Sequence, residues 1–119
     1  MWAFSLASVL SAYFILAANS WMQHPVGVEL VDGRPRMASI GDVLTNSTVL
    51  AAWPHTILGA FAVAATFLVG IGAWRLWRSR DDHDVWRASV KLGAWAGIVA
   101  FAGLAVTGDL QSKLMFEPQ

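Results

Sequence analysis

Three long apolar stretches limit what this chain of 119 residues can fold into. They cover residues 2–22, about 49–74 and about 88–107. Crossing the hydrocarbon core of a bilayer takes about 20 mainly apolar residues in a helix, and only a helix satisfies its own backbone groups there. Only 13% of the residues are charged, against about 25% in a soluble domain. The sequence therefore predicts an all-α membrane protein with three transmembrane helices.

The first and third stretches each need a separate argument. Residues 2–22 follow no positively charged segment and exceed the apolar core of a signal peptide, so we interpret them as a span. The third stretch contains Lys91, whose side chain can reach back to the headgroups. It also contains Gly93, Gly97 and Gly103, and small residues let membrane helices approach closely. We predict that these glycines mark a packing face.

The two connecting segments differ in length and in charge. Residues 23–48 contain several Pro and Gly residues that break any regular pattern, which predicts an extramembrane loop. The basic residues in or beside the shorter segment, 76–87, are Arg75, Arg78, Arg80, Arg87 and Lys91. The longer loop has only Arg34 and Arg36. The positive-inside rule therefore places residues 76–87 in the cytoplasm, and the 23–48 loop and the C-terminus outside.

Composition excludes several classes of protein and of cofactor site. The net charge is zero and the basic residues lie at the ends of apolar stretches, so no basic face for nucleic acid is predicted. The absence of cysteine excludes disulfides, iron–sulfur clusters and covalently attached haem. Most of the seven Trp residues, and Tyr13, lie near predicted span ends, where aromatic rings prefer the membrane interface.

His55 is the main candidate for a functional residue. It lies in WPHTILGAF near the outer end of the second span, and an ionisable residue within a span is by default a functional candidate. We expect Pro54 near the start of that helix, where its missing donor is tolerated. Gly59, four residues on, would leave a slim face for a flat macrocycle. From spacing alone, an interfacial position or a hydrogen bond to a neighbouring helix explains His55 at least as well as haem ligation.

Other polar residues carry weaker signals. His24 lies in the longer loop, and His83 lies in the shorter one. The acidic residues around His83 are Asp81, Asp82 and Asp84. We interpret this cluster as a solvated turn whose charge is offset by nearby arginines, rather than as a cation site.

The first predicted span carries polar residues at helical spacing. Ser8, Ser11, Ile15 and Asn19 share one helix face. Interhelical hydrogen bonds, worth about 0.6 kcal/mol each in membrane proteins, explain them. A polar path for protons that includes Ser11 and Asn19 is the alternative, and the spacing does not choose between the two.

Several motifs in order resemble one known family. They are LSAYFILAAN running into ANSWMQHPVG, then WPHTILGAF, GIGAW before the arginine-rich segment, and the pair Gly108–Asp109. Across essentially its whole length the chain resembles the fourth to sixth transmembrane helices of subunit I of cytochrome bd-type quinol oxidases, a subunit of nine helices. It is similar to the actinobacterial branch of that family.

The resemblance implies roles for individual residues. His55 would be one axial ligand of the low-spin haem b, which takes electrons from quinol near the outer face, and Gly59 would lie beside that haem. The other axial ligand would be a Met on a later helix. Ser11 and Asn19 match positions on a polar path toward the oxygen-reducing haems. His24 replaces an Asn often found in the family, and we assign it no ligand role.

The resemblance also implies partners and a location. The parent complex oxidises quinol and reduces dioxygen to water in the bacterial cell membrane, and this chain would work with the rest of subunit I and with subunit II. The haem b and haem d of the oxygen site would be ligated outside this chain, so we expect a truncated product or piece that is inactive alone. The alternative is a three-helix structural or assembly membrane protein without a cofactor. A small transporter unit is a further alternative, but the sequence has no broken helix or inverted repeat.

Overall fold

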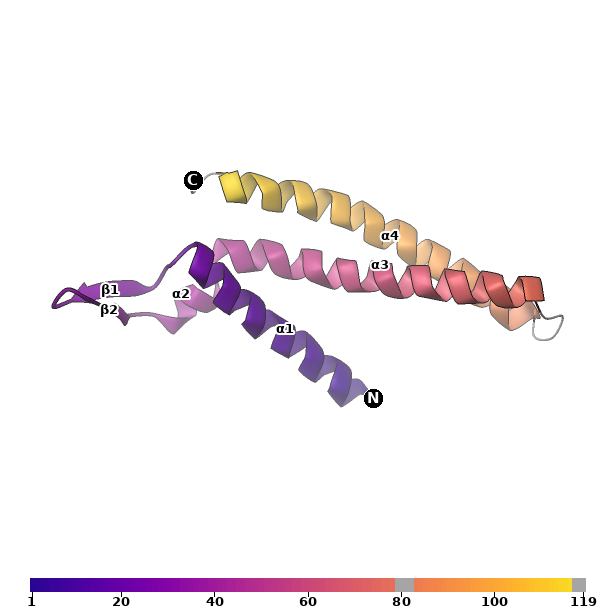
Figure 1. The fold of residues 1–119 in the computed structure, drawn as a ribbon, viewed down its shortest axis with the longest axis horizontal. Helices are drawn as coiled ribbons and strands as arrows, with labels where there is room; N and C mark the ends of the chain where they lie inside the picture. Colours follow the sequence, from indigo (N-terminus) through magenta and orange to yellow (C-terminus); the bar gives the residue numbers. More distant parts are fainter. Residues whose placement is uncertain (79–82, 117–119) are drawn as a thin grey trace. The chain divides into compact units, whose positions relative to one another are not determined.

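The computed structural model describes residues 1–78 and 83–116, and within these ranges it contains four helices and one hairpin (Figure 1). The elements are α1 (Trp2–Gln23), β1 (Val28–Val31), β2 (Arg34–Met37), α2 (Ile40–Leu44), α3 (Ser47–Arg78) and α4 (His83–Phe116). Among the described residues, α1, α3 and α4 are long and apolar enough to cross a membrane, which confirms the predicted fold class. Two compact units are formed, Met1–Pro54 with the described residues from Thr107 on, and His55–Val106.

The two longest helices extend beyond the predicted spans. α3 has 32 residues, which at the α-helical rise is about 48 Å, against about 30 Å of hydrocarbon. The additional turns carry charges that suit the helix dipole, because Arg75 and Arg78 lie in the last turn of α3 and Asp84 in the first turn of α4. We expected a loop over 76–87, and this was wrong for its described residues, 76–78 and 83–87, which are helical. Arg80, Asp81 and Asp82 lie outside the described residues.

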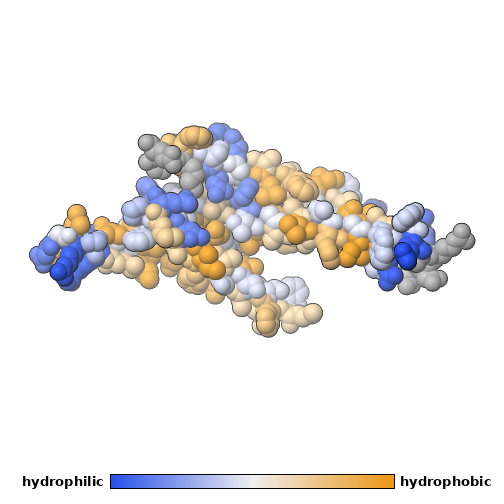
Figure 2. All heavy atoms as spheres, in the orientation of Figure 1, coloured by the Kyte–Doolittle hydropathy of each residue, from blue (hydrophilic) through white to orange (hydrophobic). Residues whose placement is uncertain are grey.

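The outer surfaces of the long helices are apolar. Figure 2 shows hydrophobic residues along the helices and hydrophilic ones at the hairpin and at the helix ends. Large side chains such as Phe4, Phe61, Phe67 and Phe101 are exposed. Such surfaces are stable against lipid or against further apolar helices, and water would not tolerate them.

The 23–48 loop is more regular than the sequence analysis predicted. β1 and β2 pair in antiparallel register, with Val31 opposite Arg34. The two residues between them, Asp32 and Gly33, both have positive φ, which is the geometry of a type I′ hairpin turn. Downstream, the Ser39 hydroxyl accepts a 3.2 Å hydrogen bond from the Asp42 amide and caps α2. The prediction that Pro and Gly leave the whole loop without regular structure was therefore wrong.

Gly27 fixes the point where the hairpin leaves α1. Its φ is +67°, and its carbonyl accepts hydrogen bonds from the amides of Ala38 and Ser39, at 2.8 and 3.2 Å. A Cβ at this position would collide with the Ser39 carbonyl oxygen. Only glycine fits both the backbone angle and the close contact.

Side-chain hydrogen bonds attach the loop to the helices of the first unit. The Tyr13 hydroxyl of α1 donates to the Leu44 carbonyl at 2.6 Å, and the Asn46 amide group donates to the His24 carbonyl at 2.9 Å. The Asn46 side-chain oxygen also accepts a bond from the Thr48 amide and so caps α3. These bonds hold the start of α3 at the end of α1.

Glycines let α3 and α4 approach closely in the second unit. A Cβ at Gly93 would lie 3.0 Å from the Ala65 carbonyl oxygen and 2.9 Å from Val69 Cγ2. A Cβ at Gly103 would lie 2.9 Å from Leu58 Cδ1. The prediction of a packing face on the third span is therefore confirmed, and its partner is α3.

Pro54 lies deeper in its helix than predicted. α3 begins at Ser47, so Pro54 is within the helix rather than at its first turn. A proline there removes the amide that would bond to the carbonyl four residues earlier, on Leu50. Pro54 is also the last residue of the first unit before His55. The expected position at the helix start was wrong because the cap supplied by Asn46 begins the helix two turns earlier.

Candidate functional site

α3 places the candidate histidine in a membrane-spanning helix. His55 lies two turns after the beginning of α3, and its side chain is half-buried. Gly59 follows four residues later, so the two residues lie one above the other on the same side of the helix. The structure therefore brings together His55 and Gly59, as the sequence predicted from their spacing.

A groove begins at Gly59. It has a volume of about 580 Å³ and is lined by Gly59, Ala62, Val63, Thr66, Phe67, Phe101 and Leu104. A Cβ at Gly59 would meet nothing within 4 Å, so the missing side chain leaves this end of the groove open. The Thr66 hydroxyl donates a 2.8 Å hydrogen bond to the Ala62 carbonyl of the same helix, so its proton is not directed into the groove. The groove therefore presents an almost wholly apolar wall.

The residues at this groove are compatible with a haem. Among the described residues, no group of three or more His, Asp or Glu side chains could hold a metal ion. A haem iron already has the four nitrogens of its macrocycle and needs only one or two further ligands from protein, so a single histidine one turn before an apolar groove is chemically compatible with it. His55, the open space at Gly59 and the apolar wall meet that requirement.

The predicted polar face of α1 is exposed in the first unit. Ser11 and Asn19 are both exposed, and neither side chain forms a hydrogen bond with another described residue. Ser8 on the same face donates to the Phe4 carbonyl of its own helix at 2.9 Å. Interhelical hydrogen bonding and a polar path both stay predictions for these residues.

Two aromatic residues that the sequence suggested were interfacial form a specific contact. The rings of Tyr13 and Trp53 meet edge to face, with centroids 5.8 Å apart, and so join α1 to α3 in the first unit. Trp53 Nε1 is buried and has no hydrogen-bond partner among the described residues. No pattern in the sequence predicts this contact, because it depends on how α1 and α3 pack.

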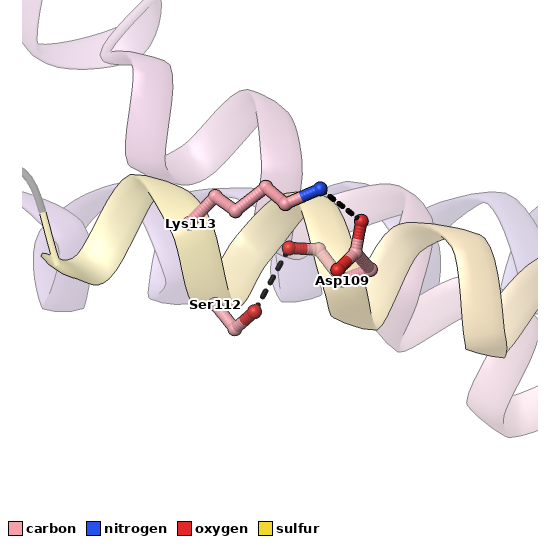
Figure 3. A network of polar contacts seen from close by, with 3 residues as sticks. All are labelled: Asp109, Ser112 and Lys113. Carbon is pink, nitrogen blue, oxygen red and sulfur yellow. Dashed lines mark hydrogen bonds and ion pairs between the residues drawn. The ribbon is translucent and has the colours of Figure 1, made fainter.

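Asp109, the acidic residue of the Gly108–Asp109 pair, interacts with residues of its own helix. Its carboxylate accepts a 2.6 Å bond from Lys113 one turn later in α4, and Ser112 donates to its carbonyl at 2.9 Å (Figure 3). Both side chains of the ion pair are well exposed. Such an exposed pair contributes little to stability.

The fold and the site together define a class of protein: a helical membrane protein with a candidate axial histidine. Comparison with known families makes the assignment specific. The model of the family described as cytochrome bd terminal oxidase subunit I matches residues 1–119, so the chain belongs to that family.

Two relatives illustrate the match. The cytochrome bd ubiquinol oxidase subunit 1 of Bacillus subtilis (strain 168) is 34% identical over 119 residues, which is 100% of this chain and 25% of that protein. The cytochrome bd-II ubiquinol oxidase subunit 1 of Escherichia coli (strain K12) is 34% identical over 110 residues, which is 91% of this chain and 21% of that protein. The chain therefore spans a quarter or less of the relatives' length.

Proposed function

We propose that this chain forms part of a terminal oxidase that oxidises quinol and reduces dioxygen to water in a bacterial cell membrane. The observation that carries the proposal is the family match over all 119 residues. The names of both relatives, ubiquinol oxidase subunits, support the same substrate class. Its partners would be the rest of subunit I, subunit II, quinol and dioxygen.

Within that complex, we propose that His55 is one axial ligand of the low-spin haem b. The half-buried imidazole, the open space at Gly59 and the apolar groove beyond it support this role. Haem b, when bound, would supply one-electron transfer between quinol and the oxygen site. His55 would hold the iron and help to set its potential. The haem b and haem d of the oxygen site would be ligated outside this chain.

For Ser11 and Asn19 we propose the polar path toward the oxygen site. Their exposed polar side chains, without hydrogen bonds among the described residues, support a surface that other parts of the complete subunit would cover. In a membrane such groups cost free energy unless they find a partner.

The proposal predicts a clear difference between this chain and the complete complex. In a bacterial strain that lacks other terminal oxidases, the complete oxidase will support quinol-dependent oxygen uptake, whereas the 119-residue chain alone will give none above background. The physical reason is that one axial histidine cannot complete a two-ligand site. An oxygen electrode on isolated membranes measures both. Uptake by the chain alone, or none by the complete oxidase, would refute the proposal.

We also propose that the α3–α4 connection is cytoplasmic and the hairpin is outside, because the basic residues gather around that connection. The chain has no cysteine, so single cysteines at Asp32 and Asp84 are unique labels. Both residues are exposed. In intact cells, we expect an impermeant maleimide to label position 32 and to label position 84 only after lysis. The reverse pattern contradicts the orientation.

A further inference from the structure

Two tryptophans and two arginines form a cluster where α3 ends and α4 begins. The Arg75 guanidinium carbon lies 5.2 Å from the ring centre of Trp86 and 5.9 Å from that of Trp74. The Arg78 guanidinium carbon lies 5.9 Å from Trp74. We call these four residues the arginine–tryptophan cluster. All of them belong to the second unit, so their arrangement is that of one compact body.

The cluster depends on the close approach of the two helices. A Cβ at Gly72 would lie 2.6 Å from Val90 Cγ2 and 3.4 Å from the Trp86 carbonyl oxygen. The glycine thus lets the first turns of α4 lie against α3, which brings the Trp86 ring to Arg75. Stacking on indole rings restricts the orientation of a guanidinium group.

The surroundings of the cluster are basic and lie at the end of the apolar helices. Arg78, Arg87 and Lys91 are exposed, and none of them forms an ion pair with a described residue. Over residues 75–91 the sequence has five basic residues, Arg75, Arg78, Arg80, Arg87 and Lys91, against three acids, of which Asp84 is described and Asp81 and Asp82 lie outside the described residues. Trp74 and Trp77 are exposed by 50% and 85%. Exposed indoles beside cations are typical of the interfacial layer of a bilayer, where headgroup phosphates lie.

We propose that the arginine–tryptophan cluster binds the phosphate of an anionic phospholipid. Basic pockets between transmembrane helices bind such headgroups, and paired guanidinium groups suit phosphate oxygens geometrically. A lipid is favoured over free phosphate because the exposed indoles provide apolar contact for the glycerol and the upper acyl chains. This site goes beyond the proposed oxidase function, since it includes neither His55 nor any residue that lines the groove at Gly59.

The test measures lipid affinity of the full 119-residue chain in mild detergent. Dioctanoyl phosphatidylglycerol is titrated while tryptophan fluorescence is recorded. We expect the double variant Arg75→Gln/Arg78→Gln to bind about 30-fold more weakly and Arg78→Gln alone about fivefold more weakly, which is the usual effect of two basic residues and of one at a lipid surface. Far-UV circular dichroism confirms that each variant stays helical. The single variant decides the matter if the double variant does not fold.

The matched control removes the same charge elsewhere. Arg34→Gln/Arg36→Gln alters two exposed arginines of the hairpin, and its affinity should equal that of the unaltered chain. Dioctanoyl phosphatidylcholine and inorganic phosphate should each bind at least tenfold more weakly than the anionic lipid. The proposal is overturned if the control loses as much affinity as the cluster variant, if phosphatidylcholine binds equally well, or if inorganic phosphate binds as tightly as the lipid.

Discussion

Replacement of His55 by alanine in the complete oxidase will remove the low-spin haem b signal and reduce quinol oxidation to background. A low-spin haem needs two strong axial ligands, and alanine offers none. The haems of the oxygen site should remain, because we propose that their ligands lie outside this chain. A reduced-minus-oxidised visible spectrum of the purified complex measures the first effect, and quinol-dependent oxygen uptake measures the second.

His24→Ala is the matched control for this experiment. The His24 backbone carbonyl accepts the bond from Asn46, and an alanine retains that carbonyl. Its spectrum should therefore equal that of the unaltered oxidase. If the His55→Ala complex assembles and keeps an unchanged low-spin spectrum, His55 is not the axial ligand.

A leucine in place of Gly59 should also reduce haem binding, in this case because its side chain takes up space. A Cβ at Gly59 meets nothing within 4 Å, so the chain's own packing tolerates a larger side chain there. Because Gly59 lines the groove, however, a branched side chain would occupy the space assigned to the macrocycle. We expect Gly59→Leu to lower the low-spin haem content of the purified complex by at least half and to lower oxygen uptake in proportion.

Gly70→Leu separates this effect from a general effect of leucine. Gly70 is also in α3, and a Cβ there also meets nothing within 4 Å, but Gly70 does not line the groove. Both substitutions raise helix propensity by the same amount. Equal haem loss in the two variants, or full haem content in Gly59→Leu, would show that the groove is not the haem site.

The transmembrane helices were predictable, whereas the structured loop was not predicted. A run of about 20 apolar residues satisfies its own backbone groups in lipid only as a helix, so α1, α3 and α4 follow from the sequence. The hairpin carries a recognisable signal, Asp32–Gly33 between two short β-forming runs. Pro35 and the glycines give the opposite signal, because they usually break regular structure. Pro35 lies in β2, in a two-stranded sheet, where a missing donor can face an unpaired edge.

The candidate site was predictable only along one helix. His55 and Gly59 lie on α3 at a spacing that fixes their common face, so the sequence alone relates them. The far wall of the groove comes from Phe101 and Leu104 of α4, and their register against α3 depends on which glycines pack where. The same holds for the contact between Arg75 and Trp86. These contacts depend on how the helices pack against each other, and the periodicity of a single sequence does not predict that packing.

Pro54 has a consequence for how α3 opens locally. Helices exchange their amide hydrogens in cooperative segments, and a segment ends where the ladder of backbone bonds is interrupted. Pro54 supplies no amide to the Leu50 carbonyl, so one backbone bond is missing in this part of α3. Asn46 links the first turns of α3 to the loop, because its side chain bonds to the His24 carbonyl and to the Thr48 amide. The amides that follow Pro54 still bond to carbonyls that precede it, so motion of the first turns of α3 can reach His55 along a helix that lacks one backbone bond.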